Sequence, residues 1–456
     1  MRRIPAWVRE NPMLPWGALF LALCLGVTQF GGTNARSRFA ALRALTEGHT
    51  LAIDNYKDWT IDWSLSPNGH TYSNKAPGAV FLGLPFFALT EAVVLPLNAK
   101  KIDDKGRVPA PGYGQHLFLI LCLQMIPYLL LVLWLANQLK EKGAGKNAVL
   151  FFTLASLFGN TAAIYMNCNF GHGLAALLFL AAYFFWSERR YVLAGLFVSW
   201  TLLTDYGIAF ALPLFLAATV WRERSGKSLR QIATGALPAA IVWVWYHTAA
   251  FGSPFATAIR YSNPEQIDPP LGQFVIQGAF SLVPSFTVLL RLLFGPERGL
   301  LFTQPWVLGV FALPFLKIKG LPRGTSLLLV GSLSALLWFV AGVGGWHGGW
   351  CAGPRYLSAM IPAAALALAQ NWDALPLWLR HALWPALLVA LAFRLLVFPF
   401  SNLAPMTNLW IHYLQEFRGE HVGTSILRIS MAAVFVLIAL RWHKRRNGTI
   451  WYREKN

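Results

Sequence analysis

Two polar segments interrupt a strongly apolar chain, and both carry residue types that could do chemistry. The first segment, residues 33–78, places Asp54, Asp58 and Asp62 ahead of Lys75 in a stretch rich in tryptophan and tyrosine. A carboxylate can remove the proton of an attacking hydroxyl, and a lysine can stabilise a departing phosphate. At a membrane surface, these groups together indicate transfer from a lipid phosphate. The alternative interpretation is a solvated loop with aromatic anchors at the interface.

The second polar segment, residues 344–356, is rich in glycine and tryptophan. Glycine permits tight turns and the close approach of a ligand to the backbone. Pro354 suits the first turn of a helix, where the Arg355 guanidinium and the helix N–H groups could bind a phosphate together. The alternative is an interfacial aromatic belt with an arginine that reaches water. Four further residues of the segment are predicted to contact substrate: Trp346, His347, Trp350 and Tyr356.

Two isolated ionisable residues lie within or at the start of apolar runs. His172 follows Asn169-Phe170-Gly171 and could bind a phosphate or an acceptor, or serve as a structural residue at a helix end. Asp205 interrupts the long apolar stretch 191–221. An ionisable group inside a membrane segment indicates a functional site, and the alternative is a partnered residue at the tip of a hairpin. We predict that Asp205 contacts substrate.

Composition defines the class of protein that must position these residues. Only 12% of the 456 residues are charged and 56% are hydrophobic, whereas a soluble protein carries about 25% charged residues. These values exclude a water-soluble enzyme, a disordered chain and a disulfide-stapled secreted domain. The formal net charge is +19, but the cations lie in short clusters between apolar runs. That distribution is typical of the cytoplasmic loops of membrane proteins, so no nucleic-acid partner is expected.

The apolar segments predict an all-α, polytopic integral membrane protein with about 12 transmembrane helices. Each span needs about 20 mostly apolar residues. Two of the predicted spans form a hairpin over 191–221 that turns at Asp205. The other ten are 14–32, 115–137, 147–166, 171–187, 231–250, 299–316, 324–343, 356–370, 381–399 and 426–441.

The segment 78–97 decides the topology, because it is apolar but contains Pro85, Glu91 and Pro96. In one topology it dips into the membrane without crossing. In the other it crosses, and 191–221 is a single long helix. The two arrangements place nearly equal numbers of lysines and arginines in the cytoplasm, so the positive-inside rule does not separate them.

The chain is predicted to be a single transmembrane domain over residues 1–456 with three parts outside the membrane. These parts are a first extracytoplasmic loop with juxtamembrane helices (33–113), a second large extracytoplasmic loop (251–297) and a basic cytoplasmic tail (441–456). The tail is expected to lie on the anionic inner leaflet. The sequence shows no cluster of metal ligands, so neither a metal nor another cofactor is expected.

Five sequence blocks are spread along the chain up to about residue 360. They are SRFAALRAL with the later GHTYSNKAPG, then NFGHGLAALLFLAAY (169–183), FGSPF (251–255), RGLLFTQPW (298–306) and GWHGGWCAGPRYL (345–357). These blocks resemble bacterial membrane glycosyltransferases of the GT-C fold, in the branch of the lipid A aminoarabinose transferase and, more distantly, the protein O-mannosyltransferases. The resemblance implies that a sugar passes, with inversion, from a polyprenyl-phosphate carrier to a hydroxyl of a lipid, glycan or protein.

The resemblance also implies where the reaction takes place. It puts the active site on the outer face of the bacterial inner (cytoplasmic) membrane, toward the periplasm or exterior. It favours the topology in which 78–97 does not cross. Lys75-Ala76-Pro77 matches the Lys-Pro-Pro element of the family, with alanine in place of the first proline. Lys75, Arg355 and His172 are therefore predicted to bind the donor phosphate.

The catalytic base is the point at which this chain departs from the family. The family opens this loop with an acidic residue, but this chain has Asn34-Ala35-Arg36 there. Asp54 is therefore predicted as the catalytic base, with Asp62 as the second choice. Four more residues of the loop are predicted to contact substrate: Asn34, Arg36, Arg38 and Tyr72.

A transporter or flippase of lipid-linked glycans is the competing interpretation, and a non-catalytic assembly protein is the third. A transporter is expected to contain internal repeats with paired broken helices near the membrane midplane. The sequence shows no such repeat, and its polar motifs gather on one face. A GT-C glycosyltransferase that uses a polyprenyl-phosphate sugar is therefore the favoured prediction.

Overall fold

The structure is a computed structural model of the chain. It describes residues 13–26, 32–94, 112–266, 268–276, 280–316, 321–397 and 404–418. The predicted span at 426–441 and the predicted tail at 441–456 lie outside the described residues.

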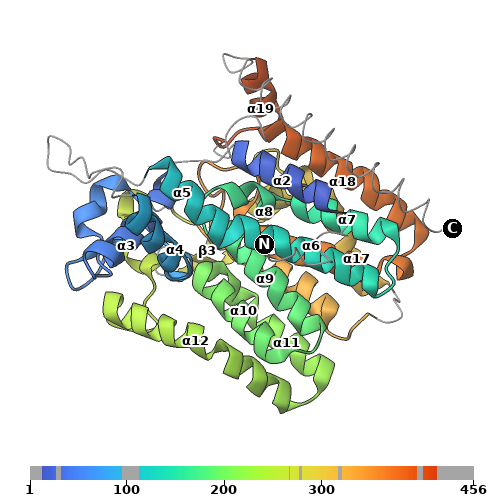
Figure 1. Cartoon of the computed structure of the whole chain (residues 1–456), viewed down its shortest axis with the longest axis horizontal. Coiled ribbons are helices and arrows are strands. Elements are labelled where there is room, and N and C mark those ends of the chain that lie inside the picture. Colours follow the sequence, from blue (N-terminus) through green and yellow to red (C-terminus); the bar gives the residue numbers. More distant parts are fainter. Residues whose placement is uncertain are drawn as a thin grey trace.

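Helices dominate the described chain, as the sequence predicts (Figure 1). The helices of ten or more residues are α2 (Leu14–Gly26), α3 (Thr33–Glu47), α4 (Gly78–Val94), α6 (Ile126–Glu141), α7 (Lys146–Leu157), α9 (His172–Ser187), α10 (Tyr191–Thr204), α11 (Leu212–Glu223), α12 (Gly226–Phe251), α16 (Ser332–Gly342), α17 (Ile361–Gln370), α18 (Leu377–Val397) and α19 (Leu409–Arg418). Shorter helical elements include η1 (Asp54–Trp59), α5 (Tyr113–Ile120), α8 (Thr161–Ile164), η5 (Tyr206–Phe210), α13 (Phe286–Phe294), α14 (Leu300–Thr303), α15 (Leu308–Ala312) and η11 (Arg355–Met360).

Two short β-hairpins accompany the helices, and the all-α prediction did not include them. One hairpin pairs β1 (Trp63–Leu65) with β2 (Thr71–Ser73) in the first predicted loop. The other pairs β3 (Gly272–Ile276) with β4 (Phe280–Pro284) in the second. Their strands are only three and five residues long, which is too short for a sequence dominated by apolar helices to reveal them.

Two helical stretches of the described chain are long and apolar enough to cross a membrane. They are Gly114–Glu141, which runs through α5 and α6, and Leu377–Val397, which is α18. Lys146–Leu157 and Thr161–Asn167 make a third if this pair, bent by 48°, is one span. The other apolar helices are 10–17 residues long, so the expected number of about 12 spans is not confirmed. Several apolar segments that hydropathy predicts as single spans are divided by turns into two or more shorter helices.

The stretch 191–221 is one of these divided runs, and it folds back on itself. α10 ends at Thr204, Asp205 is extended, and α11 begins after the short turn of η5. The far ends of the two helices meet, because the Tyr191 hydroxyl donates to Glu223 at 2.6 Å and Arg189 pairs with Glu223 at 3.1 Å. The predicted hairpin with Asp205 at its tip is therefore present.

α4, which opens the ambiguous segment 78–97, begins beside the end of α10. A Cβ on Gly78 would lie 2.7 Å from the backbone of α10. Further along, Gly83 faces Leu119 of α5, and Phe87 and His116 pack on the same ring of α3. α4 thus runs antiparallel to α5, the helix that opens the span 114–141.

The centre of the fold is apolar and closely packed. α9 is buried along nearly its whole length and lies against α10, α17 and η11. Figure 1 shows α9 between α6 and α10, with α12 beyond α10. The largest buried side chains include Trp186 of α9 and Trp306. Because α9 is held on several sides, the residues at its N-terminus have fixed positions.

Candidate functional site

The β1–β2 hairpin brings Asp62 and Lys75 together. Asp62 precedes β1 and Lys75 follows β2, and the register pairs Trp63 with Ser73, so both residues lie at the open end of the hairpin. Lys75 Nζ lies 3.1 Å from Asp62 Oδ1, and 18% and 13% of the two side chains are exposed. The Ser37 hydroxyl of α3 donates to the main-chain oxygen of Asp62 at 2.5 Å, which fixes the hairpin on α3.

Neighbouring charges change the titration of this ion pair. Burial lowers the pKa of Lys75 to about 8, Asp62 acts against that shift, and Arg355 and Arg38 add to it. Burial alone would raise the pKa of the Asp62 carboxyl. The positive charges of Lys75 and Arg355, together with a hydrogen bond from Thr33, instead hold this pKa below its usual value. Lys75 therefore begins to lose its proton near neutral pH, whereas Asp62 stays ionised.

Arg38 is a buried cation of α3 that reaches toward the start of α9. Its side chain is 4% exposed, and Nη1 donates to both the main-chain and the side-chain oxygen of Asn34. Its Nε is buried and has no hydrogen-bond partner among the described residues. Gly171, with φ +84°, stands directly against the guanidinium, since a Cβ there would lie 2.7 Å from Nη2.

Arg355 approaches the same region from the glycine-rich segment. Its guanidinium lies 5.6 Å from the ring centre of Phe170 and 5.0 Å from that of Tyr356. Nη2 donates to the Tyr356 hydroxyl at 3.2 Å, while Nε is buried without a described partner. A Cβ on Gly348, with φ +73°, would lie 2.8 Å from Nε. Contrary to the sequence prediction, Arg355 begins the 3-10 turn η11, and the α-helix starts only at Ile361.

His172 and Asp205 form a second polar pair beside these cations. His172 Nδ1 lies 3.1 Å from Asp205 Oδ2, and the side chains are 8% and 14% exposed. The other carboxylate oxygen accepts from the Gly207 N–H at 3.1 Å. His172 begins α9 and Asp205 is the tip of the α10–α11 hairpin, so the partnered tip residue considered from the sequence is present.

Arg38 and Arg355 connect the two pairs electrostatically. The Arg355 guanidinium lies within electrostatic range of Asp62, Lys75 and His172. Arg38 lies within range of both Asp62 and Asp205. Three cations and two carboxylates from four parts of the chain therefore meet in one cluster, called the charged cluster below. Lys75 and Arg355, far apart in sequence, belong to the same site.

Several predicted site residues lie outside the charged cluster. Asp54 is 42% exposed and pairs with His70 at 2.7 Å, and the Thr71 N–H also donates to it. Burial would raise the pKa of Asp54, but the bonds from Thr71 and His70 lower it below its usual value. Arg36 is exposed on the outer side of α3. The side-chain oxygen of Asn34 accepts a hydrogen bond from Arg38. Whether Asp54 takes part in a reaction stays a prediction.

The aromatic residues predicted to contact substrate are spread more widely. Trp346 is buried with Arg291 4.9 Å from its ring centre, and Trp350 is 65% exposed. His347 pairs with Asp268 of the second predicted loop at 3.1 Å. The ring of Tyr72 packs on Phe251 and that of Tyr356 on His172, with centroid separations of 5.5 Å in each case. Of these aromatic residues, Tyr356 lies beside the charged cluster.

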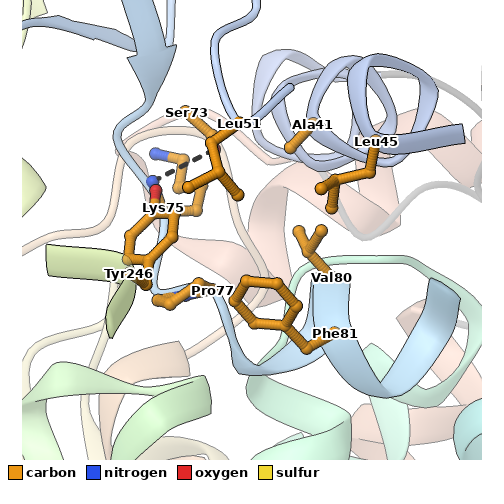
Figure 2. A pocket seen from close by; sticks show the side chains of 9 residues that line it. All are labelled: Ala41, Leu45, Leu51, Ser73, Lys75, Pro77, Val80, Phe81 and Tyr246. Carbon is orange, nitrogen blue, oxygen red and sulfur yellow. Dashed lines mark hydrogen bonds between the residues drawn. The ribbon is translucent and has the colours of Figure 1, made fainter. Parts of the chain in front are cut away.

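An apolar pocket opens next to Lys75. Figure 2 shows side chains of α3, α4 and α12 around it, with Lys75 and Ser73 on one side. The lining residues are Ala41, Leu45, Leu51, Ser73, Lys75, Pro77, Val80, Phe81 and Tyr246. The pocket has about 10 Å³ of free volume, which is room for about one water molecule, so in this structure it is a small apolar gap beside Lys75.

Arg298 is a structural support of the site that the sequence analysis did not single out. It is fully buried and donates to the main-chain oxygens of Glu297, His347, Gly349 and Ala404. It thereby ties the glycine-rich segment to two other parts of the chain. Its position at the start of the block RGLLFTQPW is the feature of the sequence that could have indicated its importance. Among the described residues, no three His, Cys, Asp or Glu side chains are grouped to hold a metal ion.

Comparison with known proteins identifies the fold. No family model and no curated protein sequence matches this chain. Its structure is similar to the crystal structure of ArnT from Cupriavidus metallidurans bound to undecaprenyl phosphate, with a TM-score of 0.50 and 14% sequence identity. The similarity covers 96% of this chain and 77% of that chain. The fold is therefore GT-C-like, as the sequence blocks predicted. ArnT is one protein that has a similar structure.

Proposed function

We propose that this protein is a membrane glycosyltransferase that moves a sugar from a polyprenyl-phosphate carrier to a hydroxyl acceptor on the extracytoplasmic face. The observation that carries the proposal is the charged cluster, in which Lys75, Arg38 and Arg355 outnumber Asp62 and Asp205 by one. Largely buried charges of one sign need a counter-charge. A phosphodiester that links a lipid to a sugar carries one negative charge, which matches this excess.

The free donor groups of the cluster support a phosphate in particular. Arg38 Nε and Arg355 Nε are both buried without a described partner. Guanidinium groups bind phosphate oxygens through parallel N–H donors, and lysine acts as a point charge. As the bond between sugar and phosphate breaks, negative charge grows on the departing phosphate, and fixed cations stabilise that charge.

The apolar pocket supports a lipid as the carrier of that phosphate. Val80 and Phe81 of α4 and Leu45 of α3 line the pocket, and Lys75 borders it (Figure 2). The pocket has room for about one water molecule, so the proposal requires these walls to move apart before the first isoprene units pack on them while the phosphate meets Lys75. ArnT, the protein of similar fold, has been crystallised with undecaprenyl phosphate.

Asp62 is the better placed of the two aspartates predicted as the base, because it lies beside Lys75 whereas Asp54 lies on the exposed side of the loop. Its ion pair with Lys75 suggests that it also holds the lysine in place when no donor is bound. The substrates that this proposal implies are a polyprenyl-linked sugar and a hydroxyl of a lipid, glycan or protein.

Donor binding and sugar transfer, measured separately, test this function. The protein is reconstituted in lipid nanodiscs and supplied with a labelled polyprenyl-phosphate sugar and a membrane extract as the acceptor. Lys75→Met and Arg355→Gln are each expected to weaken donor binding about 10- to 100-fold, the effect of losing one charged hydrogen bond. Native mass spectrometry reports donor binding, and label in the acceptor fraction reports transfer.

Lys57→Gln is the matched control, since Lys57 belongs to the same loop but lies 4.1 Å from the ring centre of Trp63. It should bind and transfer like the unmodified protein. Donor binding that survives both site variants would contradict the proposal. Donor binding without any transfer by the unmodified protein would instead support the lipid-linked-glycan flippase.

A further inference from the structure

The pair His172–Asp205 has the geometry of a proton-accepting dyad. Both oxygens of the Asp205 carboxylate are engaged, one by His172 Nδ1 at 3.1 Å and the other by the Gly207 N–H at 3.1 Å. A carboxylate at Nδ1 selects the tautomer that carries its proton there. Nε2 of the neutral ring then holds a free lone pair, which is the basic atom of an imidazole.

The second nitrogen of the ring is buried and unused. His172 Nε2 has no hydrogen-bond partner among the described residues, although the side chain is only 8% exposed. The rings of Tyr165 and Tyr356 stand nearly edge-on to the imidazole, with centroids 5.8 and 5.5 Å away. A buried histidine nitrogen without a partner costs free energy unless a ligand meets it.

The predicted aspartates are less suited to take a proton. Asp62 is paired with Lys75, and its lowered pKa makes it a weak base. Asp54 is bonded to His70 and to the Thr71 N–H on the exposed side of the loop. His172 differs from both because its basic atom is unoccupied.

We propose that His172 Nε2 removes the proton of the acceptor hydroxyl and that Asp205 is the positioning residue for the imidazole. This inference rests on the proposed glycosyl transfer and assigns a residue to one step of it. The acceptor oxygen forms a bond to the anomeric carbon as its proton passes to Nε2. The bond from that carbon to the phosphate oxygen breaks, and its electron pair stays on the phosphate.

The charges around His172 are consistent with a proton that arrives and leaves. Arg38 and Arg355 lie within electrostatic range of the imidazole and oppose its protonation, while Asp205 favours it. Tyr165 and Tyr356 complete the set of titratable groups that face the ring. The released polyprenyl phosphate carries an additional negative charge near these cations. The imidazolium can return its proton to that phosphate, whose second pKa is about 6.

The pH dependence of transfer at saturating donor tests the assignment. For the unmodified protein, kcat is expected to rise between pH 5 and pH 8, because a histidine base must be neutral to act. His172→Gln should lower kcat by about 10²- to 10⁴-fold and abolish this rise. Asp205→Asn removes the negative charge beside the ring, so it should lower the plateau and move the rise to lower pH. Donor binding, read by native mass spectrometry, should persist in both variants.

His70→Gln is the matched control, because His70 also pairs with an aspartate, Asp54, but is 59% exposed. It should leave kcat and its pH profile unchanged. Retention of the pH-dependent rise in His172→Gln overturns the assignment, and so does loss of donor binding in that variant, which would make His172 a phosphate ligand.

The remaining results also decide the question. If the His172→Gln protein does not fold, the pH profile of kcat for Asp205→Asn is the deciding measurement. An unchanged pH profile in that variant overturns the assignment. Absence of transfer by the unmodified protein would count against the proposed function itself, which separates the two failures.

Discussion

At the scale of single residues, two glycines determine where two arginines can lie. Gly171 and Gly348 both have positive φ, and a Cβ on either one would meet the guanidinium of Arg38 or Arg355 within 3 Å. Side chains other than glycine adopt this backbone region at a cost. The motifs that contain these glycines were visible in the sequence. The sequence did not show why glycine is needed there, because the arginine that stands against Gly171 belongs to a helix that is remote in sequence.

The lowered pKa of Lys75 makes donor binding depend on pH. Burial lowers the pKa of Lys75 from its ordinary value of 10.5 to about 8. A phosphate favours the charged form, so binding is strongest below pH 8 and weakens as pH rises through that value. Between pH 8 and 10, the donor dissociation constant should rise by up to about tenfold per pH unit. Titration of the labelled donor into nanodiscs at several pH values measures this.

Lys75→Arg is the comparison, since arginine stays charged throughout this range. Its donor affinity should change little between pH 8 and 10. A wild-type affinity that is equally flat would show that Lys75 does not meet the phosphate.

At the scale of elements, α10, the helix that ends beside Asp205, makes a close contact with α12 near its own start. A Cβ on Gly195 would lie 2.1 Å from the main-chain oxygen of Ile232, and one on Gly235 would lie 1.9 Å from that of Val192. Small residues let helix backbones approach in membranes. Hydropathy predicted a span at 231–250 and left 191–221 as either a hairpin or a single long helix, and it did not indicate which helices touch.

Gly235→Ala should therefore separate α10 from α12 and lower the thermal stability of the protein in detergent. Overpacking of a close contact costs about 1 to 3 kcal/mol. Gly226→Ala is the control on the same helix, since a Cβ at Gly226 would meet nothing within 4 Å. The measurement is the unfolding temperature by intrinsic fluorescence. Equal unfolding temperatures for the two variants would contradict the close contact.

At the scale of the whole molecule, the sequence predicted the GT-C-like fold. The structure places Arg355 within electrostatic range of Lys75, and the shared role of the two residues in donor binding stays a prediction. The sequence did not predict that Arg43 of α3 turns inward, where it pairs with Glu47 at 2.7 Å and lies over the ring of Phe87. It also passed over Arg298. The ion pair of Arg43 is local, because Glu47 lies four residues further along the same helix. The ring of Phe87 and the main-chain oxygens of His347 and Gly349 that Arg298 reaches are brought near only by the tertiary structure, so periodicity along the chain carries no signal for these contacts.

Arg298→Gln should loosen the glycine-rich segment and, through it, Arg355. The loss leaves several buried main-chain oxygens without a donor, at a cost of about 1 to 3 kcal/mol for each unsatisfied group. Both the unfolding temperature and the donor affinity are expected to fall. Arg260→Gln is the control, because Arg260 is an exposed arginine beside Tyr261. An Arg298 variant with unchanged donor affinity would show that the segment is held by other contacts.

The depth of the hairpin tip restricts what the proposed transferase could modify. α10 has 14 residues, which at about 1.5 Å per residue spans about 21 Å, whereas the hydrocarbon layer is about 30 Å thick. Chemistry at Asp205 would therefore occur in a recess beneath the outer surface. Only slender acceptors reach such a place: a lipid headgroup, the end of a glycan or an extended stretch of polypeptide. A hydroxyl on the face of a rigid globular domain stays out of reach.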